Sequence, residues 1–135
     1  MKFKRNYRVL AGQVDTTNHL SNVQYYEFFK SCAFAFLYDI NFTALNEPND
    51  LWPIVFNESC EFYHEVLFDQ EISVELHFTD LSEKKNKYLC HGLMYDMNGN
   101  KMAYWKSSHG ALDRKTRKIV PMSDAAFAVF QQYCG

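Results

Sequence analysis

The hydrophobic pattern of the chain has helical spacing over one long segment near its start. Between residues 22 and 39, apolar side chains recur at intervals of three and four and leave few plainly polar positions. This spacing predicts a helix over 22–39, and apolar side chains around most of its circumference predict that the helix is buried. Ser21 and Gln24 have the spacing of a capping box, with Asn22 as an alternative N-cap. We therefore expect the fold to be built around this helix.

Alternating apolar and polar positions predict strands on both sides of the helix. Residues 96–99, Asp-Met-Asn-Gly, are a strong hairpin signal because glycine adopts positive φ readily. A loop is expected over 41–53, and Ser123 is expected to cap a short C-terminal helix that ends near residue 133. Strands are expected over residues 2–10, 54–67, 72–80, 87–96 and 100–113.

These elements define an α+β fold in which a five-stranded antiparallel sheet wraps around one long buried helix, followed by a short C-terminal helix. No internal repeat or linker divides the 135 residues, so 1–135 is expected to be a single domain. One sheet around one helix leaves an edge strand and part of a face uncovered. We therefore expect a homodimer or a homotetramer.

The composition excludes several classes of protein. Fourteen Lys and Arg against sixteen Asp and Glu give a net charge of −2, which argues against a nucleic-acid-binding partner. No apolar run approaches the ~20 residues that span a bilayer, and residues 1–10 lack the apolar region of a signal peptide. The four cysteines and five histidines show no metal-ligand or redox spacing. We expect a cytoplasmic protein with reduced cysteines, no metal and no cofactor; an aromatic content of 17% is compatible with an apolar cavity.

The polar stretch over residues 12–21 is the most informative segment for chemistry. It places Asp15 and His19 close to a helix N-terminus at Asn22. Unpaired N–H groups at a helix N-terminus carry partial positive charge and can stabilise the oxyanion that forms when a thioester carbonyl is attacked. A nearby carboxylate can attack that carbonyl or deprotonate a water molecule. On spacing alone, however, Asp15 is more often a turn former, and His19 more often braces the loop by hydrogen bonds.

Residues 15–26, DTTNHLSNVQYY, resemble the signature of the 4-hydroxybenzoyl-CoA thioesterase-like hotdog family. That signature reads Asp, two variable residues, Gly, His, an aliphatic residue, Asn or Ser, Asn, two variable residues and Tyr. The resemblance implies a hotdog fold and hydrolysis of acyl thioesters. It places Asp15 on the family's catalytic acid, His19 on its usual histidine and Tyr25 on its helix tyrosine.

The resemblance covers most of the chain, because residues 60–74 and 95–113 are similar to the family's second and third hairpins. Asn18 stands where the family has Gly, and Asn tolerates the left-handed conformation better than most residues. Gln13 stands where some relatives carry another Asp, and a Pro that is common near Glu65 is absent. These departures leave the catalytic acid in place but blur the subfamily, and with it the substrate.

The residues and the resemblance together predict a site for acyl-CoA or acyl carrier protein. Asp15 acts as nucleophile or general base, assisted by His19, and the thioester oxygen lies against the backbone N–H groups of Asn22 or Val23. Two basic turns, at residues 84–87 and 114–118, are expected to bind the phosphates of CoA, or an acidic carrier protein. The residues predicted to bind substrate are Tyr25, Lys84, Lys85, Lys87, Arg114 and Lys115.

Two other functions are open at this point. A hotdog hydratase or dehydratase for acyl-CoA resembles Asp, a variable residue, Asn-Pro, a variable residue and His; here Asp15 and His19 are one residue closer and the Pro is missing. The second alternative is a non-catalytic acyl-binding module, because a fold does not by itself imply catalysis. The length and chemistry of the acyl group are not fixed by the sequence.

Overall fold

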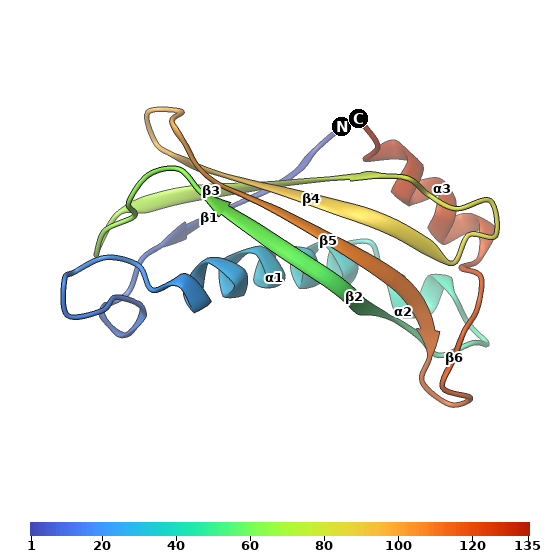
Figure 1. Cartoon of the computed structure of the whole chain (residues 1–135). Helices are drawn as coiled ribbons and strands as arrows, with labels where there is room; N and C mark the ends of the chain where they lie inside the picture. Colours follow the sequence, from blue (N-terminus) through green and yellow to red (C-terminus); the bar gives the residue numbers. More distant parts are fainter.

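The computed structural model describes all 135 residues and contains a curled antiparallel sheet with one long helix against its inner face (Figure 1). This is the predicted α+β architecture. The elements in chain order are β1 (Phe3–Arg8), the short 3₁₀ helix η1 (Ala11–Gln13), α1 (Asn22–Asp39), α2 (Phe42–Leu45), β2 (Leu51–Phe62), β3 (Glu71–Thr79), β4 (Lys87–Asp96), β5 (Lys101–Asp113), β6 (Lys118–Ile119) and α3 (Asp124–Gln132).

The sheet has the strand order β1-β3-β4-β5-β2, and β6 adds to the end of β5, so the sheet has six strands rather than the five predicted. Every pairing is antiparallel. The strand predicted over 54–67 is β2, which begins and ends several residues earlier. The loop predicted over 41–53 was wrong in part, because it contains α2 and the start of β2. Pro53 is tolerated there because β2 is an edge strand, where a missing N–H need not break the ladder.

Helix α1 has the predicted bounds, but only one of its sides is buried. The buried side chains are Tyr25, Phe28, Phe29, Cys32, Phe36 and Leu37. On the other side, Val23 and Phe34 are 66% and 47% exposed. The prediction of burial around most of the circumference is therefore wrong for a single chain, because one sheet covers only one side of a helix.

The predicted capping box at the start of α1 is also wrong. Ser21 occupies the N-cap position, but its side chain makes no capping hydrogen bond. Instead, the Gln24 N–H donates to the Ser21 carbonyl at 3.0 Å. The first turn of the helix is therefore not closed by side chains.

The helix approaches the sheet most closely at Gly92. A Cβ at this position would lie 2.5 Å from a ring carbon of Phe29, which is closer than such atoms can approach. The Phe29 ring stacks on Trp105 with a centroid distance of 5.6 Å and an interplanar angle of 8°. Both side chains are fully buried. This contact fixes the height of α1 above the sheet and hence the position of the helix N-terminus.

Candidate functional site

The loop that precedes α1 is folded tightly by backbone hydrogen bonds. The Asp15 N–H donates to the His19 carbonyl at 2.9 Å, and the Leu20 N–H donates to the Val66 carbonyl at 2.7 Å. Asn18 has a φ of 67°, which is the left-handed conformation. The expectation that Asn replaces the family's Gly at this turn is confirmed. The loop is thereby held against the segment that follows β2.

Asp15 uses one carboxylate oxygen to hold this loop together. Its Oδ1 accepts hydrogen bonds from the Thr17 N–H at 2.9 Å, the Thr17 hydroxyl at 2.5 Å and the His19 N–H at 3.3 Å. The hydrogen bonds from Thr17, followed by that from His19, lower the pKa of Asp15, so the carboxylate is ionised at neutral pH. The second oxygen, Oδ2, accepts no hydrogen bond from the chain. Asp15 is thus both a turn former and an exposed carboxylate with one free oxygen.

The N-terminus of α1 presents two backbone donors beside this loop. The Ser21 N–H donates to the Gln13 carbonyl and the Gln24 N–H to Ser21, but the N–H groups of Asn22 and Val23 have no partner within the chain. Both residues are exposed. The expectation of a buried helix N-terminus is therefore wrong for the single chain. Only a second surface laid over this end would exclude water from it.

A pocket of about 340 Å³ joins the loop, the helix N-terminus and the end of β2. Of the predicted site residues, it brings together Asp15, His19, Asn22 and Tyr25. The sequence did not predict its opposite wall, which is formed by Phe62, Tyr63, His64 and Glu65. These residues lie about fifty positions from Asp15 and meet it only because β2 runs back antiparallel to α1 (Figure 1).

His19 and Tyr25 have structural contacts in this pocket. The His19 Nε2 atom lies 3.3 Å from a Glu65 carboxylate oxygen, so the imidazole is directed toward Glu65 and braces the loop. Tyr25 is buried and packs edge-on against Phe62 at 4.8 Å. Its hydroxyl donates to the His64 carbonyl at 3.5 Å, and burial raises its pKa. Tyr25 therefore forms the floor of the pocket.

The predicted basic turns lie at the opposite end of the folded molecule from the loop that carries Asp15 (Figure 1). Two of their cations are already paired. Lys85 forms an ion pair with Asp124, and the Arg114 guanidinium binds one Asp50 oxygen through two nitrogens at 2.6 and 3.2 Å. Within one chain, the structure does not bring these turns to the pocket at Asp15. The predicted basic residues without an ion pair are Lys84, Lys87 and Lys115.

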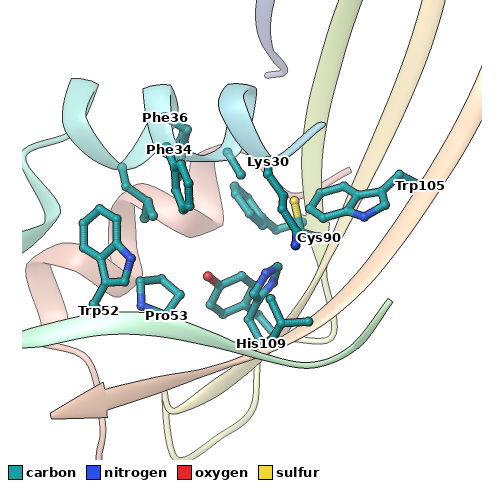
Figure 2. A pocket seen from close by; sticks show the side chains of 13 residues that line it. Lys30, Phe34, Phe36, Trp52, Pro53, Cys90, Trp105 and His109 are labelled. Carbon is teal, nitrogen blue, oxygen red and sulfur yellow. The ribbon is translucent and has the colours of Figure 1, made fainter. Parts of the chain in front are cut away.

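A second cavity, of about 170 Å³, lies between the C-terminal half of α1 and the sheet (Figure 2). The polar side chains of Lys30 and His109 face this space. Two of the side chains that line it, Phe34 on α1 and Val55 on β2, are also exposed on the surface. The aromatic content of the sequence was compatible with such a cavity but gave no position for it. Its walls include Phe34, Phe36, Trp52, Phe78, Tyr88 and Trp105.

The cysteines offer no nucleophile to either cavity. All four are free; Cys32 and Cys90 are buried, Cys60 is partly exposed and Cys134 is exposed. Burial raises the pKa of Cys32 to about 12 and raises that of Cys90 well above its usual value, so both remain thiols at neutral pH. No three His, Cys, Asp or Glu side chains are grouped closely enough to hold a metal ion. None of the helices is long and apolar enough to cross a membrane.

The sequence matches a family model described as the thioesterase-like superfamily over residues 9–130. No curated protein matches it significantly. The family match covers both the loop at Asp15 and the whole of the sheet from β2 onward.

Solved structures of similar fold match 94% or more of the chain. A hypothetical protein from Staphylococcus aureus, solved in complex with CoA, has a TM-score of 0.88 at 14% identity over 100% of this chain and 87% of its own. A 1,4-dihydroxy-2-naphthoyl-CoA thioesterase from Synechocystis has a TM-score of 0.82 at 13% identity over 97% and 96%. A gentisyl-coenzyme A thioesterase has a TM-score of 0.80 at 15% identity over 94% and 98%. These similarities confirm the predicted hotdog fold.

Proposed function

Because the chain belongs to the thioesterase-like superfamily, we propose that it hydrolyses acyl-CoA thioesters with Asp15 as the reacting carboxylate. One observation carries the proposal. An ionised Asp15, whose Oδ2 accepts no hydrogen bond from the chain, lines the same pocket as Asn22, whose backbone N–H at the start of α1 has no partner; Val23 does not line this pocket. The solved CoA complex of the Staphylococcus aureus protein and the activity named for the Synechocystis protein support acyl-CoA as the substrate class.

In the proposed reaction, the backbone N–H groups of α1 bind the thioester oxygen and the Asp15 carboxylate acts as the base or the nucleophile. The thioester oxygen lies against the N–H of Asn22 or Val23, where the donors and the helix dipole stabilise the negative charge that develops on attack. Asp15 then deprotonates a water molecule, whose oxygen bonds to the carbonyl carbon as the C–S bond breaks and the CoA sulfur takes up a proton. Alternatively, the carboxylate attacks the carbonyl carbon directly, the C–S bond breaks and CoA leaves as a thiolate that takes up a proton, and water then hydrolyses the mixed anhydride. Both routes regenerate Asp15 and release a carboxylic acid and CoA.

We infer that the working unit is a homodimer formed through β2. This strand has 12 residues, pairs with β5 on one side only and lies next to the exposed apolar side of α1. Such an edge is expected to be covered, because unpaired backbone groups and exposed apolar side chains favour association. Antiparallel pairing of two β2 strands about a twofold axis would bury the unpaired backbone groups of β2 and the exposed apolar side chains of α1 at once. A homotetramer would need a further surface beyond this one.

Twofold pairing would also bring together features that lie apart in one chain. Antiparallel pairing sets the end of β2, near Phe62, beside the start of the partner's β2, near the partner's Leu51. The partner's apolar cavity and the partner's basic turns would then approach Asp15. In this arrangement one chain supplies the carboxylate, while the other supplies the acyl cavity and the cations for the CoA phosphates.

The proposal is tested by hydrolysis of a panel of acyl-CoA and acyl carrier protein thioesters, with the released thiol measured. We expect the wild-type protein to hydrolyse at least one of them. The Asp15→Asn variant keeps an oxygen for the hydrogen bonds of the loop but loses the charge, so it should fold normally and lose activity by about 10²- to 10⁴-fold. Near-normal turnover by a folded Asp15→Asn variant would contradict the role of Asp15. Absence of hydrolysis across the panel would contradict the proposed function.

A further inference from the structure

Two polar side chains in the wall of the apolar cavity each have a side-chain atom without a hydrogen-bond partner. Tyr88 and His109 are opposite each other on β4 and β5 and stack with a centroid distance of 5.1 Å. They are 5% and 8% exposed, and both line the cavity. None of the hydrogen bonds within the chain involves the Tyr88 hydroxyl, and the His109 Nδ1 atom is buried without a partner. Buried polar groups are normally paired, so unpaired ones in a cavity wall suggest a missing ligand.

The hydrogen bonds around His109 indicate which of its two ring nitrogens carries the proton. The Ser107 hydroxyl donates its one hydrogen to the Asn57 carbonyl at 3.5 Å, so its oxygen accepts from His109 Nε2, which is 3.3 Å away. The proton of the neutral imidazole is then on Nε2, and Nδ1 carries a free lone pair. Nδ1 is covered in this conformation, so contact with a ligand requires the ring to rotate toward the cavity, which gives up the 3.3 Å contact with Ser107 and changes the stacking on Tyr88.

We propose that this cavity selects acyl groups of about six carbons that carry a hydroxyl at the end far from the thioester, an inference that rests on the proposed function. A hydroxyl matches both unpaired groups, because it can accept from the Tyr88 hydroxyl and donate to His109 Nδ1. The cavity of about 170 Å³ is similar in volume to one of about 150 Å³ that binds benzene, a six-carbon ring. The remaining wall is aromatic and suits the carbon chain (Figure 2).

Other polar acyl ends fit this wall less well. Burial, and secondarily the charge of Lys30, lowers the pKa of His109 to about 4, so the imidazole is neutral and provides no cation for a carboxylate. The Lys30 ammonium lies 3.5 Å from a Glu58 carboxylate oxygen and is thereby already paired. A ketone accepts from Tyr88 but leaves the lone pair of His109 unmatched. A purely aliphatic end leaves both groups unmatched, which is costly in a buried site.

Fragment binding tests the selection without requiring any catalysis. Cyclohexanol and cyclohexane are added separately to the wild-type protein, and thermal unfolding is followed. We expect cyclohexanol to raise the melting temperature more than cyclohexane does, and the Tyr88→Phe variant to lose this difference. Tyr95→Phe, on the other face of β4, is the matched control and should keep it. Equal stabilisation by the two fragments, or none by cyclohexanol, would overturn the proposal.

The second arm measures kcat/KM for 6-hydroxyhexanoyl-CoA and hexanoyl-CoA. The wild-type protein should prefer the hydroxylated substrate, and Tyr88→Phe should reduce this preference by about fivefold, the effect of one hydrogen bond. His109→Leu should reduce it further if that variant folds. An unchanged ratio in Tyr88→Phe would overturn the selection. Absence of hydrolysis with both substrates would count against the proposed function instead, and fragment binding would then decide the cavity's selectivity alone.

Discussion

At the scale of single residues, the two oxygens of Asp15 have separate tasks. Oδ1 accepts three hydrogen bonds and closes the turn, whereas Oδ2 accepts none from the chain. The sequence predicted this residue because the whole motif lies within eight positions and needs no long-range contact. The same reasoning could not find Tyr88 or His109, because strand pairing places them in a wall with helix residues far away in the sequence.

The pH dependence of hydrolysis should respond to the hydrogen bonds on Asp15. The Thr17 hydroxyl is the largest cause of the lowered pKa of Asp15, so Thr17→Ala should raise that pKa. Because the ionised form reacts, the acid limb of the kcat/KM profile should move to higher pH, with little change above neutral pH. Thr16→Ala, which removes no hydrogen bond to Asp15, is the matched control. An unmoved acid limb in Thr17→Ala would contradict Asp15 as the titrating group.

At the scale of elements, α1 was predicted with its full bounds of 22–39, because its apolar spacing is unambiguous. Strands β3, β4 and β5 were predicted to within one residue at each end for the same reason. The start of β2 was missed because Pro53 resembles a loop residue and is acceptable only at a sheet edge. The buried side of α1 could not be predicted, since both of its sides are apolar.

The backbone donors of α1 can be removed one at a time. Proline fits the first turn of a helix but lacks an N–H, so Val23→Pro or Asn22→Pro should remove one donor without unfolding the helix. If that donor holds the oxyanion, kcat should fall by about 10²- to 10³-fold. Val23→Ala and Asn22→Ala keep the N–H and should lose less activity than Asp15→Asn does. Full activity in both proline variants, with normal circular dichroism, would rule out this oxyanion site.

The contact between α1 and the sheet should be sensitive to a single methyl group at Gly92. A Cβ at this position would overlap the buried Phe29 ring, which is stacked on the buried Trp105 side chain. Gly92→Ala should therefore lower the free energy of unfolding by about 1–3 kcal/mol. Gly12→Ala, where no atom lies within 4 Å of a new Cβ, is the control and should change it little. Chemical denaturation measures both, and equal stability of the two variants would show that α1 can shift at this contact.

At the scale of the whole molecule, Asp15 lines a pocket at the N-terminal end of α1, whereas the apolar cavity is lined by residues of the C-terminal half of that helix. Twofold pairing through β2 would join the carboxylate of each chain to the cavity of the other. Light scattering should therefore give about twice the chain mass of 15.9 kDa, or a multiple of that dimer. A stable monomer at micromolar concentration would exclude the composite site.

The most direct test of this account is complementation between two inactive variants. Asp15→Asn removes the carboxylate but keeps the cavity, whereas Ala33→Phe fills the cavity but keeps the carboxylate. If each site combines Asp15 of one chain with the cavity of the other, a mixed dimer contains one intact site. Unfolding and refolding the two variants together in equal amounts should then restore about a quarter of wild-type activity, as random pairing of twofold dimers requires. If the mixture is no more active than either variant alone, although mixed dimers have formed, the composite site is contradicted.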